Sequence, residues 1–242
     1  PSTQLDDCEE TRLMAEITAV MAAKQPFASI DVHNNTGKNP HYGCINHLEP
    51  SFLHLSALFS RTIVFFETPK GVQAMGMAPH CPSVTIECGK PGMAHGIDHA
   101  FEFLDAVLNL AEIPDHPIHP QDVDVYHTVA RVLIAEELDF SFTRNDAQLT
   151  LWPEIERYNF SELEAGAVFG EVSDGAQRPV QALNDNGEDM AAELFRVDHG
   201  RLTLSRPMMP SMLTLDEQVI RQDCLCYLME RIALPDHCIP TD

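Results

Sequence analysis

The first 110 residues of the chain alternate between segments with helical spacing of apolar residues and short runs of β-branched residues. Helical spacing occurs from Asp6 to Lys24, through Leu13, Ile17 and Val20, and returns from Gly96 to Leu110. The predicted strands cover residues 27–33, 62–66 and 83–87, and a further short helix covers residues 52–59. Because parallel strands need crossover connections, commonly helices, this alternation predicts an α/β layer structure with at least some parallel pairing of its strands.

A proline-rich segment, IPDHPIHP at residues 113–120, interrupts this pattern. Each proline lacks an amide donor and restricts the residue before it. Beyond this segment the chain reads as short strands separated by Asn, Asp, Gly and Pro turns. We therefore predict an α/β domain over residues 1–112 and a small β-rich domain over residues 121–242. A Thr-Leu-Asp-Glu capping pattern predicts a closing helix at residues 214–232.

The charge and the cysteines restrict the class of partner and the cellular setting. A formal net charge of -22 repels phosphate backbones and anionic lipid headgroups, so no nucleic-acid or membrane partner is expected. No apolar run approaches the roughly 20 residues that span a bilayer. The seven scattered cysteines indicate reduced thiols and a cytoplasmic protein. A homo-oligomer is possible and is left open.

The stretch DVHNNTGKNPHYGC begins where the first predicted strand ends, and this is the edge at which ligands collect in open α/β sheets. Asp31 and His33 lie on one side of an extended strand, so the Asp31 carboxylate can accept the ring proton of an imidazole that binds metal through its other nitrogen. The alternative is an ordinary hydrogen-bonded loop histidine. Glu87 ends a second buried strand and is followed by CGKPG. Burial there would raise its pKa toward that of a general base, although a structural ion pair is equally open.

Together, DVHNNTGKNPHYGCIN and TIECGKPG resemble the succinylglutamate desuccinylase and aspartoacylase family of the zinc carboxypeptidase clan. The resemblance covers residues 1 to about 111 and is architectural beyond them. It implies a zinc carboxypeptidase-like α/β domain, with a mixed sheet and helices on both of its faces, followed by a smaller β-rich domain that narrows access to the site. It also implies a zinc-dependent hydrolase that cleaves the amide bond of an N-acyl amino acid with a metal-activated water.

The resemblance assigns roles to individual residues. His33 would be one of three protein ligands to a single zinc ion, Asp31 would orient His33, and Glu87 would be the catalytic base. The family's His-x-x-Glu ligands and its Asn-Arg motif, which supplies an oxyanion-binding Arg, have no match before Asp31. We therefore expect a preceding segment that carries them. The His-x-x-Glu at His99 and Glu102 follows Glu87 and fits an ordinary helix turn better.

The substrate is expected to be a small amide or peptide that bears a carboxylate. Asn34, Asn35, Lys38 and Lys90 are the candidate substrate-binding residues, although lysines in loops are commonly solvated charges. A second metal site is not predicted, because the remaining histidines have no ligand spacing: His80, His95, His116, His119 and His127. Two alternatives remain open, a metallocarboxypeptidase acting on peptides and an inactive, metal-free binding protein on the same scaffold.

Overall fold

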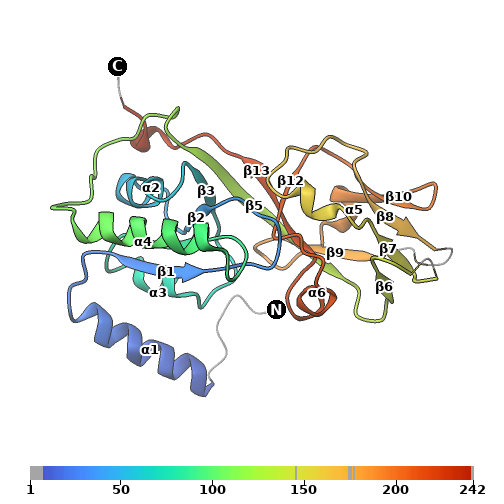
Figure 1. Cartoon of the computed structure of the whole chain (residues 1–242), viewed down its shortest axis with the longest axis horizontal. Helices are drawn as coiled ribbons and strands as arrows, with labels where there is room; N and C mark the ends of the chain where they lie inside the picture. Colours follow the sequence, from blue (N-terminus) through green and yellow to red (C-terminus); the bar gives the residue numbers. More distant parts are fainter. Residues whose placement is uncertain (1–7, 145, 174–175, 177, 241–242) are drawn as a thin grey trace.

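The protein, described by a computed structural model over residues 8–144, 146–173, 176 and 178–240, contains a large mixed sheet and a smaller second sheet. The large sheet has eight strands in the order β1-β4-β2-β3-β5-β13-β12, and β9 also pairs with β5. Its strands are β1 (Ser29–His33), β2 (Tyr42–Ile45), β3 (Thr62–Phe65), β4 (Ser83–Glu87), β5 (Asp124–Ile134), β9 (Val180–Leu183), β12 (Met209–Ser211) and β13 (Cys226–Arg231). The long strand β5 runs from one lobe of the molecule into the other (Figure 1).

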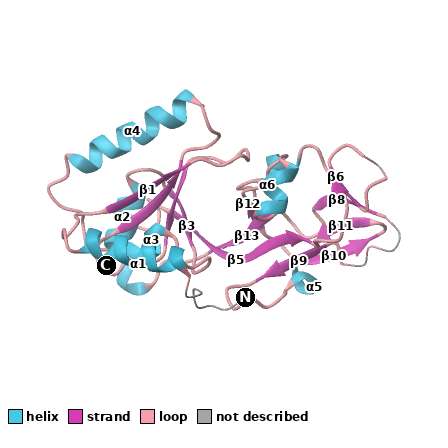
Figure 2. Cartoon of the chain, turned by 90° about the horizontal axis from the view of Figure 1, so that it is seen from below, coloured by secondary structure: helices cyan, strands magenta, loops and turns pink. Residues whose placement is uncertain are grey.

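Helices cover both faces of the N-terminal part of this sheet. On one face, α2 (Pro50–Ala57) and α4 (Ala94–Leu108) bury side chains such as Phe103 against Val84 and Ile86. On the other face lies α3 (Gln73–Met77), whose Ala74 carbonyl accepts a hydrogen bond from Ser83. Figure 2 shows these helices around the strands of the α/β lobe. The predicted mixed α/β fold with a second, smaller sheet is confirmed.

The first helix, α1 (Glu9–Ala22), buries none of its residues. Its predicted apolar residues Leu13, Ile17 and Val20 are about half exposed, at 55%, 49% and 60% of their accessible surface. The start of the predicted helix at Asp6 lies outside the described residues. The helix itself is therefore confirmed from Glu9 onward, while its apolar face contacts little of the rest of the molecule.

The second sheet forms the C-terminal lobe. Its strands follow the order β10-β11-β8-β7-β6. They are β6 (Phe140–Ser141), β7 (Leu149–Leu151), β8 (Val168–Val172), β10 (Phe195–Asp198) and β11 (Arg201–Leu204), with α5 (Ala191–Leu194) before β10 and a 3-10 turn at Ile155–Tyr158. A second 3-10 turn, Asp236–Cys238, packs on the core of the N-terminal lobe. Alternate residues of these strands, such as Phe169 and Leu202, form one core with Val132 of β5 and Leu228 of β13.

The predicted closing helix at residues 214–232 is wrong in extent. Helix α6 (Glu217–Gln222) is short and begins at Asp216, whose side chain accepts hydrogen bonds from the amides of Gln218 and Val219. The chain then forms β13, because Cys226–Arg231 pairs with β5 in a long antiparallel ladder. Strand pairing thus overrides helix propensity there.

The proline-rich segment does not separate the strands of the two parts. Strand β5 begins just after it at Asp124 and pairs in parallel with β3, so the large sheet contains strands from both sides of residues 113–120. The division into domains 1–112 and 121–242 stays a prediction.

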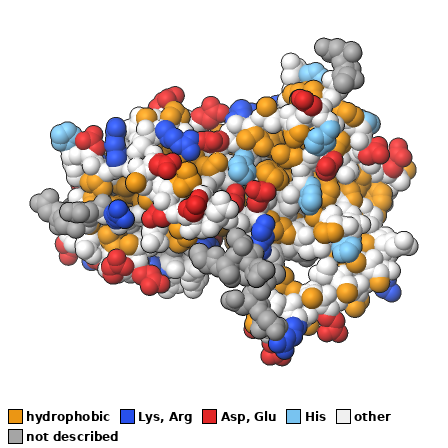
Figure 3. Space-filling view, turned by 180° about the vertical axis from the view of Figure 1, so that it is seen from behind, with side chains coloured by type: hydrophobic (Ala, Val, Ile, Leu, Met, Phe, Trp, Pro, Cys, Tyr) orange, Lys and Arg blue, Asp and Glu red, His pale blue; other side chains and the backbone are white. Residues whose placement is uncertain are grey.

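Acidic side chains are spread over both lobes (Figure 3). None of the helices described here is long and apolar enough to cross a membrane.

Candidate active site

The candidate site lies where two neighbouring parallel strands end. Strands β1 and β4 pair in register from Ser29 opposite Ser83 to His33 opposite Glu87. The β-branched run that precedes Glu87 is fully buried in the sheet, which fixes the strand and the direction of its last side chain. His33 and Glu87 therefore emerge side by side at the carboxyl edge of the sheet.

The His33 imidazole has a different neighbour at each ring nitrogen. Nε2 lies 3.1 Å from Oδ2 of Asp31, and Nδ1 lies 3.8 Å from Oε1 of Glu87. Asp31 is two residues before His33 on the same face of β1, as the extended chain requires. The contact with Asp31 leaves Nδ1 as the nitrogen available to a ligand.

Glu87 is almost completely buried, with 7% of its surface exposed. Burial raises the pKa of its carboxyl group, whereas a hydrogen bond from Nδ2 of Asn35 to Oε2, at 3.1 Å, and the nearby His33 act in the opposite direction. The result is a carboxyl group whose pKa is raised above its ordinary value and whose Oε1 lies toward His33. Such a group suits proton transfer near neutral pH.

Asn35 is itself held by a series of hydrogen bonds. Its Oδ1 accepts from Nδ2 of Asn39 at 2.8 Å, and Oδ1 of Asn39 accepts from the amide of Met212 at 3.0 Å. Met212 directly follows β12, so this series joins the carboxyl edge of β1 to a segment that comes much later in the chain. The position of the Glu87 carboxylate thus depends on both parts of the protein.

A cavity of about 300 Å³ opens beside these residues. Asp31, His33 and Glu87 line it, together with side chains from the C-terminal part such as Tyr227. Its other lining residues are Tyr42, Cys44, Val64, Phe66, Thr68, Pro69, Val72, Gln73, Thr85, Thr128, Ser211, Met212 and Asp223. A concave site lined mainly by apolar groups, with a few convergent polar side chains, is typical of a small-molecule site.

Several cavity residues could not be predicted from the sequence. Tyr42 and Cys44 belong to β2, a four-residue strand inside a segment that reads as a polar loop. Strand β2 pairs with β4 in antiparallel and with β3 in parallel, and so lies in the middle of the sheet. Its four residues give no period that could have predicted this strand.

The predicted substrate-binding residues lie outside the lining of the cavity. Asn34 donates a hydrogen bond to the Gly89 carbonyl at 3.1 Å, and Asn35 is engaged with Glu87. The ammonium group of Lys90 lies 3.0 Å from a carboxylate oxygen of Glu156, and Lys38 is exposed. Their roles in binding a substrate stay predictions.

The residues beside His33 give an incomplete set of metal ligands. His33 fits as a ligand, because it lines the cavity and its ring lies against Asp31. A catalytic zinc ion needs about three protein ligands. Within the described part of the chain, one group of three ligand side chains has its ligand atoms within 4.8 Å of one another, and His33 is not in it.

Comparison with solved structures identifies the fold. The chain superposes on murine aminoacylase 3 with a TM-score of 0.57 at 15% sequence identity, covering 96% of this chain and 73% of that one. A succinylglutamate desuccinylase from Vibrio parahaemolyticus gives a TM-score of 0.52 at 14% identity, over 95% of this chain and 63% of that one. A succinylglutamate desuccinylase/aspartoacylase from Rhodobacter sphaeroides gives 0.51 at 11% identity, over 90% and 62%.

The chain thus spans about three fifths of the length of those two bacterial proteins. No protein-family model and no curated protein matches the sequence. The resemblance seen in the two motifs is therefore confirmed at the level of the fold.

Proposed function

We propose that this chain, which has the fold of aminoacylase 3 and of the succinylglutamate desuccinylases, is a hydrolase that cleaves the amide bond of an N-acyl amino acid. The single observation that carries the proposal is the arrangement of His33 and Glu87. A buried carboxylate with a raised pKa and an oriented imidazole lie together at the edge of a cavity. These are the groups that water-mediated amide hydrolysis requires.

Glu87 is the proton-transfer group of this proposal. Its Oε1 faces His33, while Oε2 is fixed by Asn35, so the carboxylate can accept a proton from a water in the cavity and pass it to the leaving nitrogen. Asn35 therefore positions the base. Asp31 fixes the tautomer and direction of the His33 ring.

His33 is the zinc ligand of the proposal, bound through Nδ1. A zinc ion, when bound, lowers the pKa of a coordinated water and polarises a carbonyl group. Two further ligands are needed, and the described residues near His33 do not supply them. Two of the structures compared above are an aminoacylase and a succinylglutamate desuccinylase by name, which supports a small acyl amino acid as substrate.

A carboxylate on the substrate would need a local positive charge in so acidic a protein. Lys38 and Lys90 are the proposed donors. Lys90 would have to exchange its ion pair with Glu156 for the substrate carboxylate. The proposal places the enzyme in the cytoplasm, and the seven free cysteines support this setting.

One observation favours the alternative of a metal-free binding protein. Among the described residues at this site, His33 is the single proposed zinc ligand. A test distinguishes the two. Protein expressed from its complete gene is assayed for zinc per chain and for release of amino acid from a panel of N-acetyl and N-succinyl amino acids, with short peptides alongside. The His33→Ala variant and a His199→Ala control, in which the replaced side chain is 95% exposed, are assayed in parallel.

Loss of deacylation and of one zinc ion per chain in His33→Ala, with both retained in His199→Ala, supports the proposal. Turnover of peptides in preference to acyl amino acids would identify a carboxypeptidase. Protein without zinc and without turnover would contradict the enzyme proposal and support a binding protein.

A further inference from the structure

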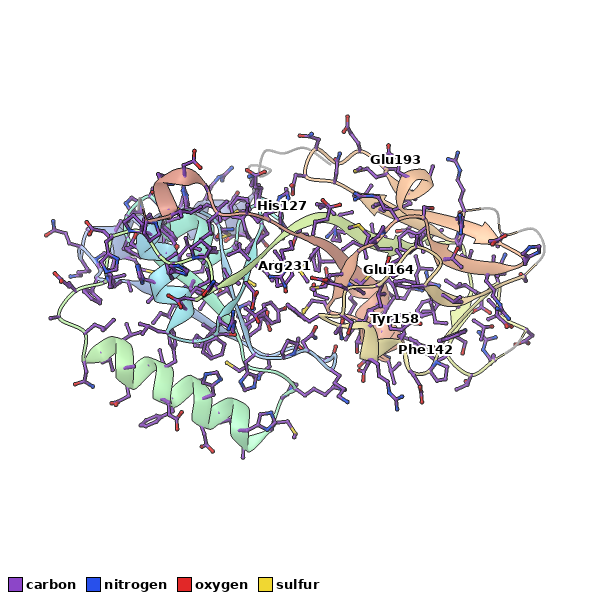
Figure 4. All side chains as sticks on the ribbon, turned by 90° about the horizontal axis from the view of Figure 1, so that it is seen from above. His127, Phe142, Tyr158, Glu164, Glu193 and Arg231 are labelled. Atoms are coloured by element: carbon purple, nitrogen blue, oxygen red, sulfur yellow. The ribbon has the colours of Figure 1, made fainter. Side chains whose placement is uncertain are left out.

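Three ligand side chains converge between the two lobes, apart from the cavity. They are Glu67, His127 and Asp185, and their ligand atoms lie within 4.8 Å of one another. Figure 4 shows His127 where the chain passes from one lobe to the other. None of the three lines the cavity described above.

The pairing of the strands explains this convergence. Phe65, the last residue of β3, pairs with His127 of β5, and Glu67 follows Phe65 by two residues. On the other side, β9 runs antiparallel to β5, with Leu183 opposite Arg131. Beyond Leu183 the chain therefore runs in the direction of His127. Asp185 lies in the turn that follows β9. Three segments far apart in sequence thus meet at one point of β5.

The ring of His127 has an unsatisfied nitrogen. Nε2 is buried and has no hydrogen-bond partner, and the closest carboxylate oxygen, Oδ2 of Asp185, is 3.6 Å away. That distance is too long for a hydrogen bond. The ring itself is packed against Phe65, with 5.4 Å between the ring centres. A buried polar atom without a partner is costly, and a cation between Nε2 and the carboxylates would satisfy it.

The Asp185 carboxylate is oriented for such a role. Its Oδ1 accepts a hydrogen bond from Oγ1 of Thr68 at 2.6 Å, while Oδ2 is the oxygen on the side of His127. Metal-bound carboxylates are commonly held in this way by a hydrogen bond to the oxygen that does not bind the metal. Thr68 also lines the cavity, so the cluster and the candidate active site share a neighbouring residue.

We propose that Glu67, His127 and Asp185 form a second site for a divalent transition-metal ion, with Zn²⁺ as the best fit. Zinc accepts one imidazole nitrogen and two carboxylate oxygens as ligands. A water molecule would be the fourth ligand, on the side of the exposed Glu67. Small rotations of these side chains would bring the ligand atoms to the roughly 2.0–2.2 Å that zinc requires. The ion would join the loop after β3 to the turn after β9 and so fasten the two lobes beside the cavity.

The test uses Zn²⁺ alone as the probe and a background that removes the other proposed zinc ligand. In the His33→Ala protein, stripped of metal and titrated with Zn²⁺, the proposal predicts one bound ion per chain and a rise in Tm. Adding His127→Ala abolishes both effects, and adding Asp185→Asn weakens the binding by more than tenfold. Thr68→Val removes only the orienting hydroxyl and is expected to weaken binding by about tenfold.

The control is His33→Ala combined with His199→Ala, which removes an exposed histidine elsewhere and should leave zinc binding unchanged. If His127→Ala disturbs folding, as judged by circular dichroism, Asp185→Asn decides the question. The proposal is overturned if the His33→Ala protein binds no zinc, or if its zinc affinity is unchanged by both His127→Ala and Asp185→Asn. This result is independent of deacylase activity, so it separates the second site from the proposed function.

Discussion

Nδ1 of His33 lies 3.8 Å from Oε1 of Glu87, and the backbones of these two residues are paired in register at the ends of β1 and β4. This relationship concentrates the candidate chemistry at one edge of the sheet. It depends on the strand register, since a shift by one residue would turn Glu87 to the opposite face.

Replacing Asn35 by Ala should destabilise the protein by about 1–3 kcal/mol. The reason is that Oε2 of the buried Glu87 would lose the hydrogen bond from Nδ2 of Asn35. Urea unfolding followed by circular dichroism measures the change. Asn34→Ala is the matched control, because the exposed Asn34 donates to a backbone carbonyl and not to a buried carboxylate. If both substitutions lowered the free energy of unfolding equally, the hydrogen bond from Asn35 to Glu87 would not stabilise the protein more than the one from Asn34.

Gly96→Ala should destabilise the protein by about 1–3 kcal/mol through overpacking. A methyl group at Gly96 of α4 would lie 2.2 Å from the carbonyl oxygen of Cys88, which follows Glu87 directly. The helix would have to move away from the site. Gly76→Ala in α3 is the control, because its methyl group would meet nothing closer than 3.5 Å and alanine favours a helix. Thermal unfolding of both variants tests this, and a neutral Gly96→Ala would contradict the close packing.

Asp124→Asn should destabilise the protein at neutral pH and have no effect in acid. Hydrogen bonds from Arg231, at 2.6 Å, and from Arg61, at 2.8 Å, hold the pKa of the Asp124 carboxyl below its ordinary value. A lowered pKa in the folded state gives stability that is fully present above the ordinary carboxyl pKa of about 4 and is lost as the pH falls through the lowered value. We expect a difference of about 1 kcal/mol between wild type and variant at neutral pH.

Urea unfolding at several pH values measures this difference, with Asp115→Asn at an exposed position as the control. A difference that persists unchanged well below pH 4 would show that the charge of Asp124 is not its cause.

Alkylation of the native protein at mildly alkaline pH should modify Cys8 first. Cys8 is exposed, whereas five of the other cysteines are buried. Burial raises the pKa of the Cys88 thiol to about 11, with Glu87 adding to the effect, so little reactive thiolate is present there. Mass spectrometry after timed treatment with iodoacetamide reads out the order. Early modification of Cys88 would contradict its burial.

Much of the large sheet was predictable because its local signals agree. The β-branched residues before Glu87 predict β4, and the apolar spacing in residues 96–110 predicts α4 within two residues of its ends. Strand β2 was missed because four residues in a polar segment give no period, and its place in the sheet depends on partners from β3 and β4. The end of the chain was misread as helix because the pairing of β13 with β5 is a long-range interaction.

In the candidate site, too, contacts within one strand could be predicted and contacts between distant segments could not. Asp31 and His33 are close in sequence, so the strand period alone placed them together. The contacts of Asn35 with Glu87, of Lys90 with Glu156 and of His127 with Asp185 join distant segments and could not be read from spacing.

Turnover of an N-acyl amino acid substrate by Glu87→Gln decides whether Glu87 is the catalytic base. Glutamine keeps the shape of Glu87 but cannot accept a proton. We expect kcat to fall by at least about 100-fold, while the unfolding transition and the metal content remain those of the wild type. A variant that folds normally and turns over at the wild-type rate would show that Glu87 is not the base.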